Sequence, residues 1–322
     1  LRSSAGSGKT TGVIESVVYT DNYIEYYPPS HKLAQEINNK LKKKYRFIQV
    51  QVMRGRSHKE NESQPLCKKS EIASQLSKLG FGVYNQLCNN EDKDEQCEYF
   101  KNCQYINQFN REVQVRIYNH SYLGIDRGFL DREMPGNVVI DESFFKNLLV
   151  STEYKQRDFL GSGENKNLFD AIIFAIDNKR GVLKHLRETF SEQLISTLES
   201  AITMISARIE SSEISPRMSA SEMKSKLTSS NVHSKKQLLL LNTFLTEVTK
   251  FPDRNQSQAF RHVNNKMMLY TRQEITRFDY TAKDKDGQEI LKKIPILCID
   301  ADHSQQINRV FFPNIMQLTI QT

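Results

Sequence analysis

Apolar and polar residues recur with two different periods along the chain, and the order of these periods predicts the fold. Runs rich in β-branched and aromatic residues predict strands, whereas apolar residues three or four positions apart predict helices. The predicted strands are Tyr23–Tyr27, Phe47–Met53, Val113–Tyr118, Val138–Glu142 and Ile294–Ile299. A helix is predicted after Ser30, a residue type that caps helix N-termini. Strands that alternate with helices indicate an α/β fold with a parallel sheet.

Two long segments interrupt this alternation. Residues 57–112 are polar and contain four of the five cysteines. Residues 151–290 are predicted to be largely helical, because apolar residues recur at helical spacing from Leu194 to Ile205 and from Leu241 to Val248. The Ser- and Lys-rich segment between them, from Ser211 to Lys236, is predicted to be a mobile loop. Met268–Tyr280 alternates more like strands.

The segment before the first predicted strand, Ser4–Thr11, has the composition of a phosphate-binding loop. Its glycines allow a tight turn whose backbone N–H groups face the phosphates of a nucleotide such as ATP. Lys9 is expected at the β- and γ-phosphates, and the Thr10 hydroxyl at Mg²⁺. Ser3 stands where the motif has its first glycine, a position that requires only a small residue. The residues assigned to the ATP phosphates are Ala5, Gly6, Ser7, Gly8, Lys9, Thr10 and Thr11. A chance Gly-Ser-Gly turn is the alternative.

Two carboxylates follow the apolar run Val138–Ile140 and are the expected partners of this loop. The carboxyl ends of parallel strands present their next residues to the ligand crevice. Asp141 is therefore predicted to hold Mg²⁺, directly or through water, and Glu142 to orient and deprotonate the attacking water. An Asp-Glu pair at a strand end is common by chance, so the prediction depends on the upstream loop.

Composition indicates a globular protein with a basic surface. The net charge is +7 and the pI is about 9.0, which is compatible with a polyanionic partner. Between Lys32 and Lys69 the chain holds 11 Lys and Arg residues against three Glu. This excess predicts contact with nucleic-acid phosphates, and a solvated basic face is the alternative. The candidate cations that flank the cysteine segment are Arg54, Arg56, Lys59, Lys68 and Lys69.

No apolar run approaches the roughly 20 residues of a membrane span, and no signal peptide is recognised, so a cytoplasmic protein without a membrane partner is expected. The chain opens without Met and leaves no room for a strand before the phosphate loop, which indicates a fragment. In a reducing compartment, clustered cysteines suggest a metal rather than disulfides.

Four cysteines lie in the polar segment, namely Cys67, Cys88, Cys97 and Cys103. They are separated by 20, eight and five residues, which is not the paired spacing of an ordinary zinc ribbon. Four thiolates nonetheless suit a tetrahedral site for Zn²⁺ or an iron–sulfur cluster. A polar segment of this length has little apolar surface to bury, so it needs a cross-link such as a bound metal to fold. Four unrelated reduced cysteines are the alternative.

The order of these parts resembles the iron–sulfur helicases of superfamily 2, of the XPD/DinG type. Ser4–Thr10 match the Walker A motif and Val138–Glu142 the Walker B motif. Pro29–Leu33 look like motif Ia, and Pro295–Asp302 resemble motif III. The cysteine phrase Cys97–Tyr105 looks most like helicases of phages and mobile elements, some of them fused to primase modules, which would place the protein in a host cytoplasm.

The resemblance implies a RecA-like motor domain with two insertions. Its parts would be residues 1–56, 113–150 and 291–322, the last including the start of a second motor domain, with a cluster insert at 57–112 and a helical arch-like insert at 151–290. It implies a 4Fe-4S cluster on the four cysteines, with Zn²⁺ as the alternative. It also implies ATP-driven movement along single-stranded or forked DNA, often 5′ to 3′. A second motor domain with its arginine finger would lie beyond this chain, which alone should hydrolyse ATP poorly.

Several positions depart from the family pattern or allow two roles. Phe144 and Asp302 stand where the family commonly has His and Thr. Ser30 and His31 occupy the motif Ia position, where His31 either touches a DNA phosphate or only caps the helix. His120 either stacks on a base or lies at the edge of the core. Two other functions stay open: an ATPase that remodels or loads a replication complex without unwinding, and a nucleic-acid-binding module with an incomplete ATP site.

Overall fold

The computed structural model describes residues 12, 13, 15, 23–60, 64–78, 82–125, 135–141, 144, 148–159, 163–210, 214–227, 229–253, 259–263, 266–272, 275, 279–283, 288–293 and 296–299. The chain splits into two compact units. Unit 1 comprises Leu1–Glu60, Asn102–Val150 and Arg272–Thr322, and unit 2 comprises Asn61–Lys101 and Ser151–Thr271. The five predicted segments and their bounds stay predictions.

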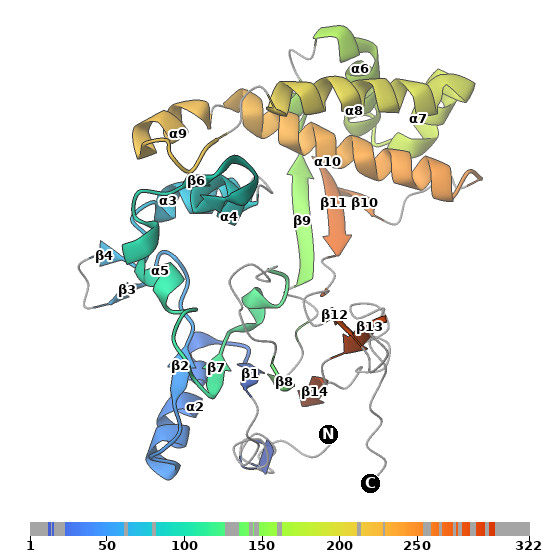
Figure 1. Ribbon diagram of the computed structural model, residues 1–322. Helices are drawn as coiled ribbons and strands as arrows, with labels where there is room; N and C mark the ends of the chain where they lie inside the picture. The colour runs from blue at the N-terminus through green and yellow to red at the C-terminus, as the bar shows by residue number, and fades with distance from the viewer. Residues whose placement is uncertain are drawn as a thin grey trace. The chain divides into compact units, whose positions relative to one another are not determined.

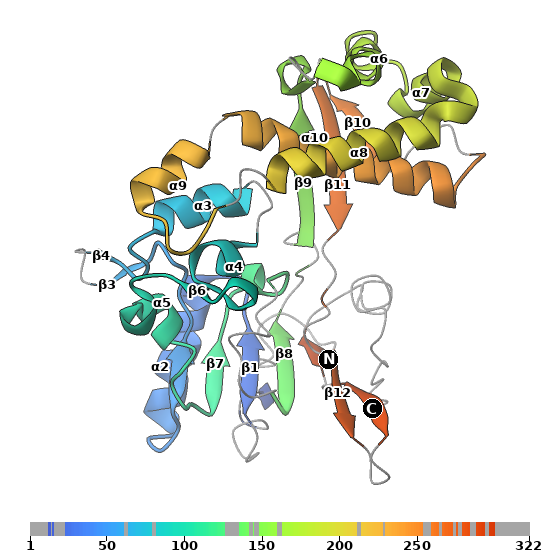
Figure 2. The same cartoon turned by 45° about the horizontal axis from the view of Figure 1, so that its top comes forward.

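A five-stranded parallel sheet forms the centre of unit 1, and Figure 1 labels its strands. The strands are β1 (Ile24–Tyr27), β2 (Val50–Val52), β7 (Val115–Ile117), β8 (Asn137–Asp141) and β14 (Ile296–Ile299). Their order is β14-β8-β1-β7-β2, and Figure 2 shows β7, β1 and β8 side by side. All four pairings are parallel, for example Ile24 with Val115 and Ile24 with Asn137. The predicted α/β class with a parallel sheet is therefore confirmed.

Helix α2 (His31–Lys44) covers one face of this sheet. Its N-cap is Ser30, whose hydroxyl accepts a hydrogen bond from the Leu33 backbone N–H at 3.2 Å. Ala34, Ile37 and Leu41 recur on its buried side and pack with sheet residues such as Ile117. The cap and the apolar spacing are the features from which the helix was predicted.

Strands β1, β7 and β8 at the centre of the sheet are buried along almost their whole length. Every residue of β1 and β7 is buried, and only Asn137 of β8 is partly exposed. Continuous burial is typical of parallel sheets that are covered on both faces. It follows that polar side chains within these strands need partners inside the protein.

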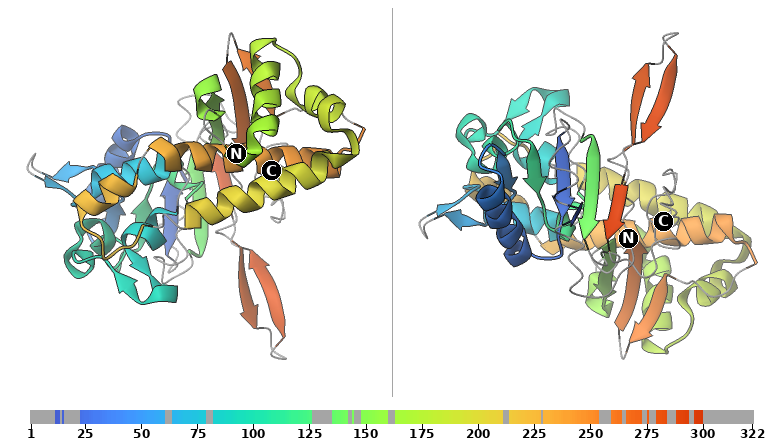
Figure 3. Two further views of the ribbon diagram at one scale, coloured as in Figure 1. Left: turned by 90° about the horizontal axis from the view of Figure 1, so that it is seen from above. Right: turned by 90° about the horizontal axis from the view of Figure 1, so that it is seen from below.

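The remaining elements of unit 1 are short. They are helix α5 (Gln104–Asn107), the 3₁₀ helix η3 (His120–Tyr122), and the hairpin strands β12 (Asp279–Lys283) and β13 (Glu289–Lys293). Figure 3 shows the hairpin, in which Asp279 pairs with Lys293. The strand predicted at Phe47–Met53 is confirmed only over Val50–Val52.

Unit 2 contains most of the helices. They are α3 (Ser70–Lys78), α4 (Val83–Leu87), α6 (Lys166–Asp177), α7 (Val182–Phe190), α8 (Leu194–Glu210), α9 (Ala220–Lys226) and α10 (Ser229–Lys250), with the 3₁₀ helices η1 (Glu91–Lys93), η5 (Gln156–Phe159), η6 (Gly163–Asn165) and η7 (Ser191–Gln193). Its strands include β5 (Asn89–Asn90), β6 (Glu95–Gln96) and β10 (Phe260–Val263). Elements at the borders of the units are β3 (Lys59–Glu60), β4 (Gln64–Pro65), η2 (Phe100–Asn102), β9 (Leu149–Tyr154) and β11 (Lys266–Arg272). Strands β10, β11 and β9 form a three-stranded sheet.

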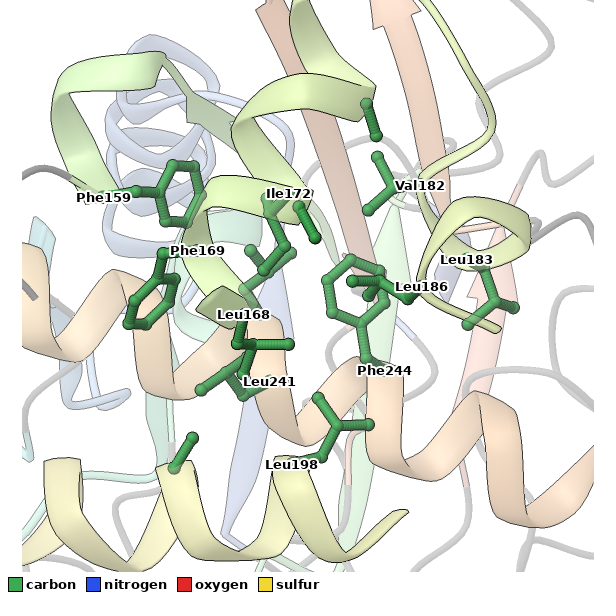
Figure 4. Close-up of a cluster of buried hydrophobic side chains, with 14 of the residues drawn as sticks. Phe159, Leu168, Phe169, Ile172, Val182, Leu183, Leu186, Leu198, Leu241 and Phe244 are labelled. Carbon is green, nitrogen blue, oxygen red and sulfur yellow. The ribbon is translucent and has the colours of Figure 1, made fainter. Parts of the chain in front are cut away.

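An apolar core joins helices α6, α7, α8 and α10 of unit 2. Figure 4 shows Leu198 of α8 and Leu241 and Phe244 of α10 in one cluster with side chains of α6 and α7. Leu198, Leu241 and Phe244 have no exposed area. The helices predicted from the spacing of apolar residues are thus confirmed.

One prediction about residues 151–290 was wrong in part. The segment from Ser211 to Lys236, predicted to be a loop, contains α9 and the start of α10. Ser219 accepts a hydrogen bond from Glu222 N, and Glu222 accepts one from Ser219 N, a capping box that fixes the start of α9. The region is otherwise largely helical, as predicted, and strand β9, which begins at Leu149, extends into its start.

Candidate nucleotide and nucleic-acid site at the carboxyl edge of the sheet

The predicted phosphate loop, Ala5–Thr11 with Lys9 and Thr10, lies outside the described residues, as do Glu142 and Asp302. The residues just after the loop are described. Gly12, Val13 and Glu15 are helical, and Val13 is buried in the sheet core. A helix after the loop is the context that the phosphate-loop motif requires, and the loop itself stays a prediction.

Asp141 is the last residue of β8, a strand flanked by β1 and β14. Its side chain is buried, and its Oδ2 atom accepts a hydrogen bond of 2.7 Å from the Tyr26 hydroxyl. Because β1 and β8 run parallel in adjacent positions, Tyr26 and Asp141 point to the same face near the carboxyl edge. A carboxylate held in this position has the chemistry of a magnesium ligand.

His120 connects the carboxyl ends of three strands. Its ring follows β7, and Nε2 lies 3.1 Å from the Tyr27 carbonyl oxygen and 2.7 Å from the Asp141 carbonyl oxygen. The ring is buried, with Phe144 edge-on at 6.3 Å between centroids. Burial lowers the pKa of His120, while the hydrogen bonds to the Asp141 and Tyr27 carbonyls act in the opposite direction. Of the two roles considered for His120, base stacking is wrong, because the ring belongs to the core.

A second set of polar side chains lies at the same edge, after β1 and β7. Asn119 donates through Nδ2 to Nε2 of His31 at 2.9 Å, and the Ser121 hydroxyl donates to Oδ1 of Asn119. The Nε2 atom of His31 is therefore an acceptor, which corresponds to a neutral imidazole. Burial, and then the positive charges of Arg54 and His58, lower the pKa of His31 below its ordinary value.

Arg54 follows β2 and extends the positive charge of this edge. Its guanidinium donates to Oε1 of Gln35 at 2.8 Å, and its backbone exchanges hydrogen bonds with the side-chain amide of Gln108, each 2.9 Å long. Arg56 stacks over the Tyr105 ring, with its Cζ atom 4.0 Å from the ring centroid. Predicted residues Ser30, His31 and Arg54 thus follow parallel strands at one edge of the sheet.

Sequence reasoning missed Tyr26, Asn119 and Ser121 as parts of this edge. Asn119 and Ser121 directly follow a predicted strand, so their position after a parallel strand could have identified them. Tyr26 lies inside a strand, and only the order of strands places it beside Asp141.

The cations that flank the cysteine segment are not all on the surface. Lys69 is buried in unit 2, where its ammonium group donates to the carbonyl oxygens of Met218 at 2.7 Å and Pro216 at 3.4 Å. Lys68 lies over the Tyr99 ring at 4.4 Å. The prediction that Lys69 contacts nucleic acid is wrong, because its buried ammonium group is hydrogen-bonded to the segment before α9.

Three of the four candidate ligand cysteines, Cys67, Cys88 and Cys97, lie in unit 2, and Cys103 lies in unit 1. The Cys97 N–H donates to the Cys88 carbonyl oxygen at 2.9 Å, at the end of the β5–β6 hairpin. Among the described residues, no three His, Cys, Asp or Glu side chains are grouped closely enough to hold a metal ion. The 4Fe-4S or Zn²⁺ site predicted on these four cysteines therefore stays a prediction.

Comparison with known proteins gives limited information. No family model matches the chain, and no curated protein matches it. Among solved structures, the chain is similar to one titled "Truncated XPD", with a TM-score of 0.42 and 14% identity over 99% of this chain and 94% of that one. A TM-score of 0.42 does not establish a common fold, so we infer nothing about the site from this likeness. In the part of the chain that the structure describes, no helix has the length and apolar character of a membrane span.

Proposed function

We propose that this chain is a RecA-like motor domain of an ATP-dependent helicase or translocase that acts on single-stranded or forked DNA. The observation that carries the proposal is the position of Asp141. It ends a central parallel strand, β8, in a chain whose start has the phosphate-loop signature with Lys9 and Thr10. A carboxylate at this edge and a phosphate loop together make a site for a magnesium nucleotide.

The roles of the nucleotide-side residues follow from their chemistry. Lys9 would bind the β- and γ-phosphates, and Thr10 and Asp141 would hold the magnesium ion. Bound Mg²⁺ supplies charge neutralisation at the phosphates. Tyr26 fixes the Asp141 carboxylate by its 2.7 Å hydrogen bond. Glu142, the next residue, would accept a proton from the attacking water.

The nucleic-acid side of the proposal is the polar edge formed by Ser30, His31, Asn119, Arg54 and Arg56. Hydroxyl, amide and imidazole groups there can donate to or accept from a phosphate or sugar, and the two arginines supply positive charge. These residues follow strands β1, β2 and β7 at one edge of the sheet. A row of polar and positively charged groups along this edge can contact the backbone of a single strand. A second motor domain and replication or primase proteins would be partners of this domain.

We also propose that Cys67, Cys88, Cys97 and Cys103 bind a 4Fe-4S cluster, with Zn²⁺ as the alternative. The support is local to unit 2. The Cys88 and Cys97 backbones are hydrogen-bonded, and Lys68 and Lys69, next to Cys67, contact Tyr99 and Glu98, next to Cys97. These contacts bring the segments that carry Cys67, Cys88 and Cys97 together. Iron and zinc analysis of protein purified without oxygen tests the proposal, which predicts about four irons per chain. A protein with neither metal would contradict it.

Nucleotide binding tests the core of the proposal. The affinity of a fluorescent, non-hydrolysable ATP analogue is measured with and without Mg²⁺. Asp141→Asn should weaken Mg²⁺-dependent binding at least about tenfold, and Lys9→Ala should weaken binding with or without Mg²⁺. Glu36→Gln, an exposed carboxylate of α2, is the matched control and should bind like the unchanged chain. Equal affinities of all four proteins would exclude a nucleotide site here.

Binding of a labelled oligothymidine tests the nucleic-acid edge. Arg54→Ala should weaken binding and reduce the slope of log affinity against log salt concentration by about one. Lys40→Ala, which removes an exposed cation of α2, should change neither the affinity nor the slope. Binding of DNA without any nucleotide binding would favour a nucleic-acid module with an incomplete ATP site. Nucleotide binding without DNA binding would favour an ATPase that remodels a replication complex.

A further inference from the structure

His120 is attached to two candidate sites at once. Its backbone N–H donates to the Pro28 carbonyl oxygen at 3.2 Å, in the turn between β1 and α2. Its side chain reaches the carbonyl oxygens of Tyr27 and Asp141. Pro28 leads into Ser30 and His31, and Asp141 leads into Glu142. His120 is thus hydrogen-bonded to the main chain at Pro28, just before Ser30 and His31, and at Asp141.

The proton of the His120 ring can be placed from its partners. Both partners of Nε2 are carbonyl oxygens, which only accept hydrogen bonds, so Nε2 carries the hydrogen. One N–H is therefore shared between two acceptors, at 2.7 Å from Asp141 and 3.1 Å from Tyr27. A small displacement of the ring would strengthen one hydrogen bond and weaken the other. The hydrogen bond can therefore be redistributed between the Tyr27 and Asp141 carbonyls by a small movement of the ring.

The residues on either side of His120 face the nucleic-acid edge. Asn119 is hydrogen-bonded to His31, and Ser121 is hydrogen-bonded to Asn119. A phosphate that binds at His31 would compete with or reorient the Asn119 amide, and so would pull on the segment that carries His120. On the other side the His120 ring contacts Phe144, three residues after Asp141.

We propose that His120 is a positioning residue that couples nucleic-acid binding at the His31–Asn119 edge to nucleotide binding at Asp141. The inference rests on the proposed function. When nucleic acid moves the Asn119–Ser121 segment, the His120 N–H redistributes between the Tyr27 and Asp141 carbonyls. The main chain at Asp141, the last residue of β8, then shifts. Coupling between two binding sites is reciprocal, so nucleotide must change the affinity for DNA by the same factor as DNA changes that for nucleotide.

The experiment measures this coupling factor in the full 322-residue chain. The affinity for a labelled oligothymidine is measured with and without a saturating magnesium complex of a non-hydrolysable ATP analogue, and the ratio is compared among three variants. His120→Leu removes the shared N–H and keeps an apolar body. His120→Gln keeps an N–H donor at the end of the side chain. Ile37→Val, a buried core change in α2, is the control for loss of packing.

In the unchanged chain, nucleotide should change the DNA affinity by about fivefold or more, the lower end of ordinary coupling between sites. His120→Leu should bring the ratio within about twofold of one, while His120→Gln and Ile37→Val should retain it. A ratio that survives His120→Leu, or a ratio of one in the unchanged chain, would overturn the coupling. Loss of either ligand's binding in the unchanged chain would instead overturn the proposed function.

A spectroscopic measurement covers the case in which His120→Leu does not fold. Histidine labelled with ¹⁵N in the unchanged chain reports the tautomer of His120 directly. The inference requires a hydrogen on Nε2, and a shift of that signal when either the oligothymidine or the magnesium nucleotide analogue is added. An Nδ1–H tautomer, or a signal that neither ligand moves, would contradict it.

Discussion

The sheet of unit 1 and the helical core of unit 2 bury different kinds of side chains. The helical core, defined by the cluster around Phe244 and Leu198, consists of apolar residues, and buried polar groups of unit 2 such as Asp158 and Gln237 are not part of it. The strands of unit 1 themselves bury Glu25, Arg116 and Asp141, and His120 is buried just after β7. Burial of such groups costs free energy unless each is hydrogen-bonded. The difference indicates that the helical core serves stability, whereas the sheet gives up some stability to hold polar groups at defined positions.

Each buried polar group of the sheet has partners among the described residues. Glu25 accepts hydrogen bonds from the hydroxyls of Tyr23 at 2.9 Å and Tyr27 at 2.5 Å. Arg116 donates to the carbonyl oxygens of Phe109 and Arg111 and to the Tyr23 hydroxyl. Tyr23 thus links the arginine to the carboxylate. This network fixes β1 and β7, the strands that lead to His31 and Asn119.

The largest expected effect is a loss of apolar contact in the helical core. Phe244→Ala should lower the free energy of unfolding by about 3–5 kcal/mol, because the side chain is fully buried and its removal leaves a cavity. Phe251→Ala is the matched control, since Phe251 is 41% exposed and should cost less than half as much. Urea denaturation followed by far-ultraviolet circular dichroism measures both. Equal losses would mean that the helical core does not carry the stability of unit 2.

The next effect concerns the polar network of the sheet. Arg116→Met should lower the free energy of unfolding by about 1–3 kcal/mol, because the Phe109 and Arg111 carbonyls and the Tyr23 hydroxyl lose a buried donor. Arg111→Met removes an exposed hydrogen bond to Gln51 and should cost less than about 0.5 kcal/mol. The same denaturation experiment compares them. If the two substitutions cost the same, the buried polar groups do not set the sheet apart.

The sequence allowed prediction of the elements with strong local signals. Strands β1, β8 and β14 are apolar runs, and Ser30 caps the start of α2. In each case the residues of the element itself are sufficient to predict it. The capping box of α9 was also local, but the Ser- and Lys-rich composition around it favoured a loop, and the prediction was wrong. Helix α9 is held by Met223, which is buried, and by a capping box that composition does not reveal.

The site could be predicted only in outline. Asp141 was recognised because a strand signal precedes it, and its position at the end of β8 is confirmed. The partners of each group depend on which strands are neighbours. The order β8-β1-β7 brings Tyr26 to Asp141 and His31 to Asn119, pairs that are far apart in the chain. Composition predicted that Lys69 lies on the surface. Its ammonium group is instead buried and donates to the carbonyl oxygens of Pro216 and Met218, which are distant in the chain.

The smallest expected effect distinguishes the polar edge from the buried network by its response to pH. His31 is exposed, and its pKa is lowered by burial of part of the ring and by Arg54 and His58. In the free protein it is therefore neutral at pH 7 and becomes charged only as the pH falls below the ordinary histidine range. A bound phosphate would offset the repulsion from Arg54 and raise the pKa of His31, so binding takes up a proton.

Affinity for oligothymidine should consequently rise as the pH falls from 7 to 5, by about three- to tenfold, the effect of up to one unit of pKa difference. His31→Gln keeps a polar side chain that cannot be protonated, and its affinity should change less over the same range. Stability should respond with the opposite sign. A histidine whose pKa is lowered by folding favours the folded state when neutral, and that contribution is lost as the pH falls from the unfolded value through the folded one. If His31→Gln has the same pH dependence of DNA affinity as the unchanged chain, then His31 is only a neighbour of the helix cap, and the polar edge loses its one titratable contact to DNA.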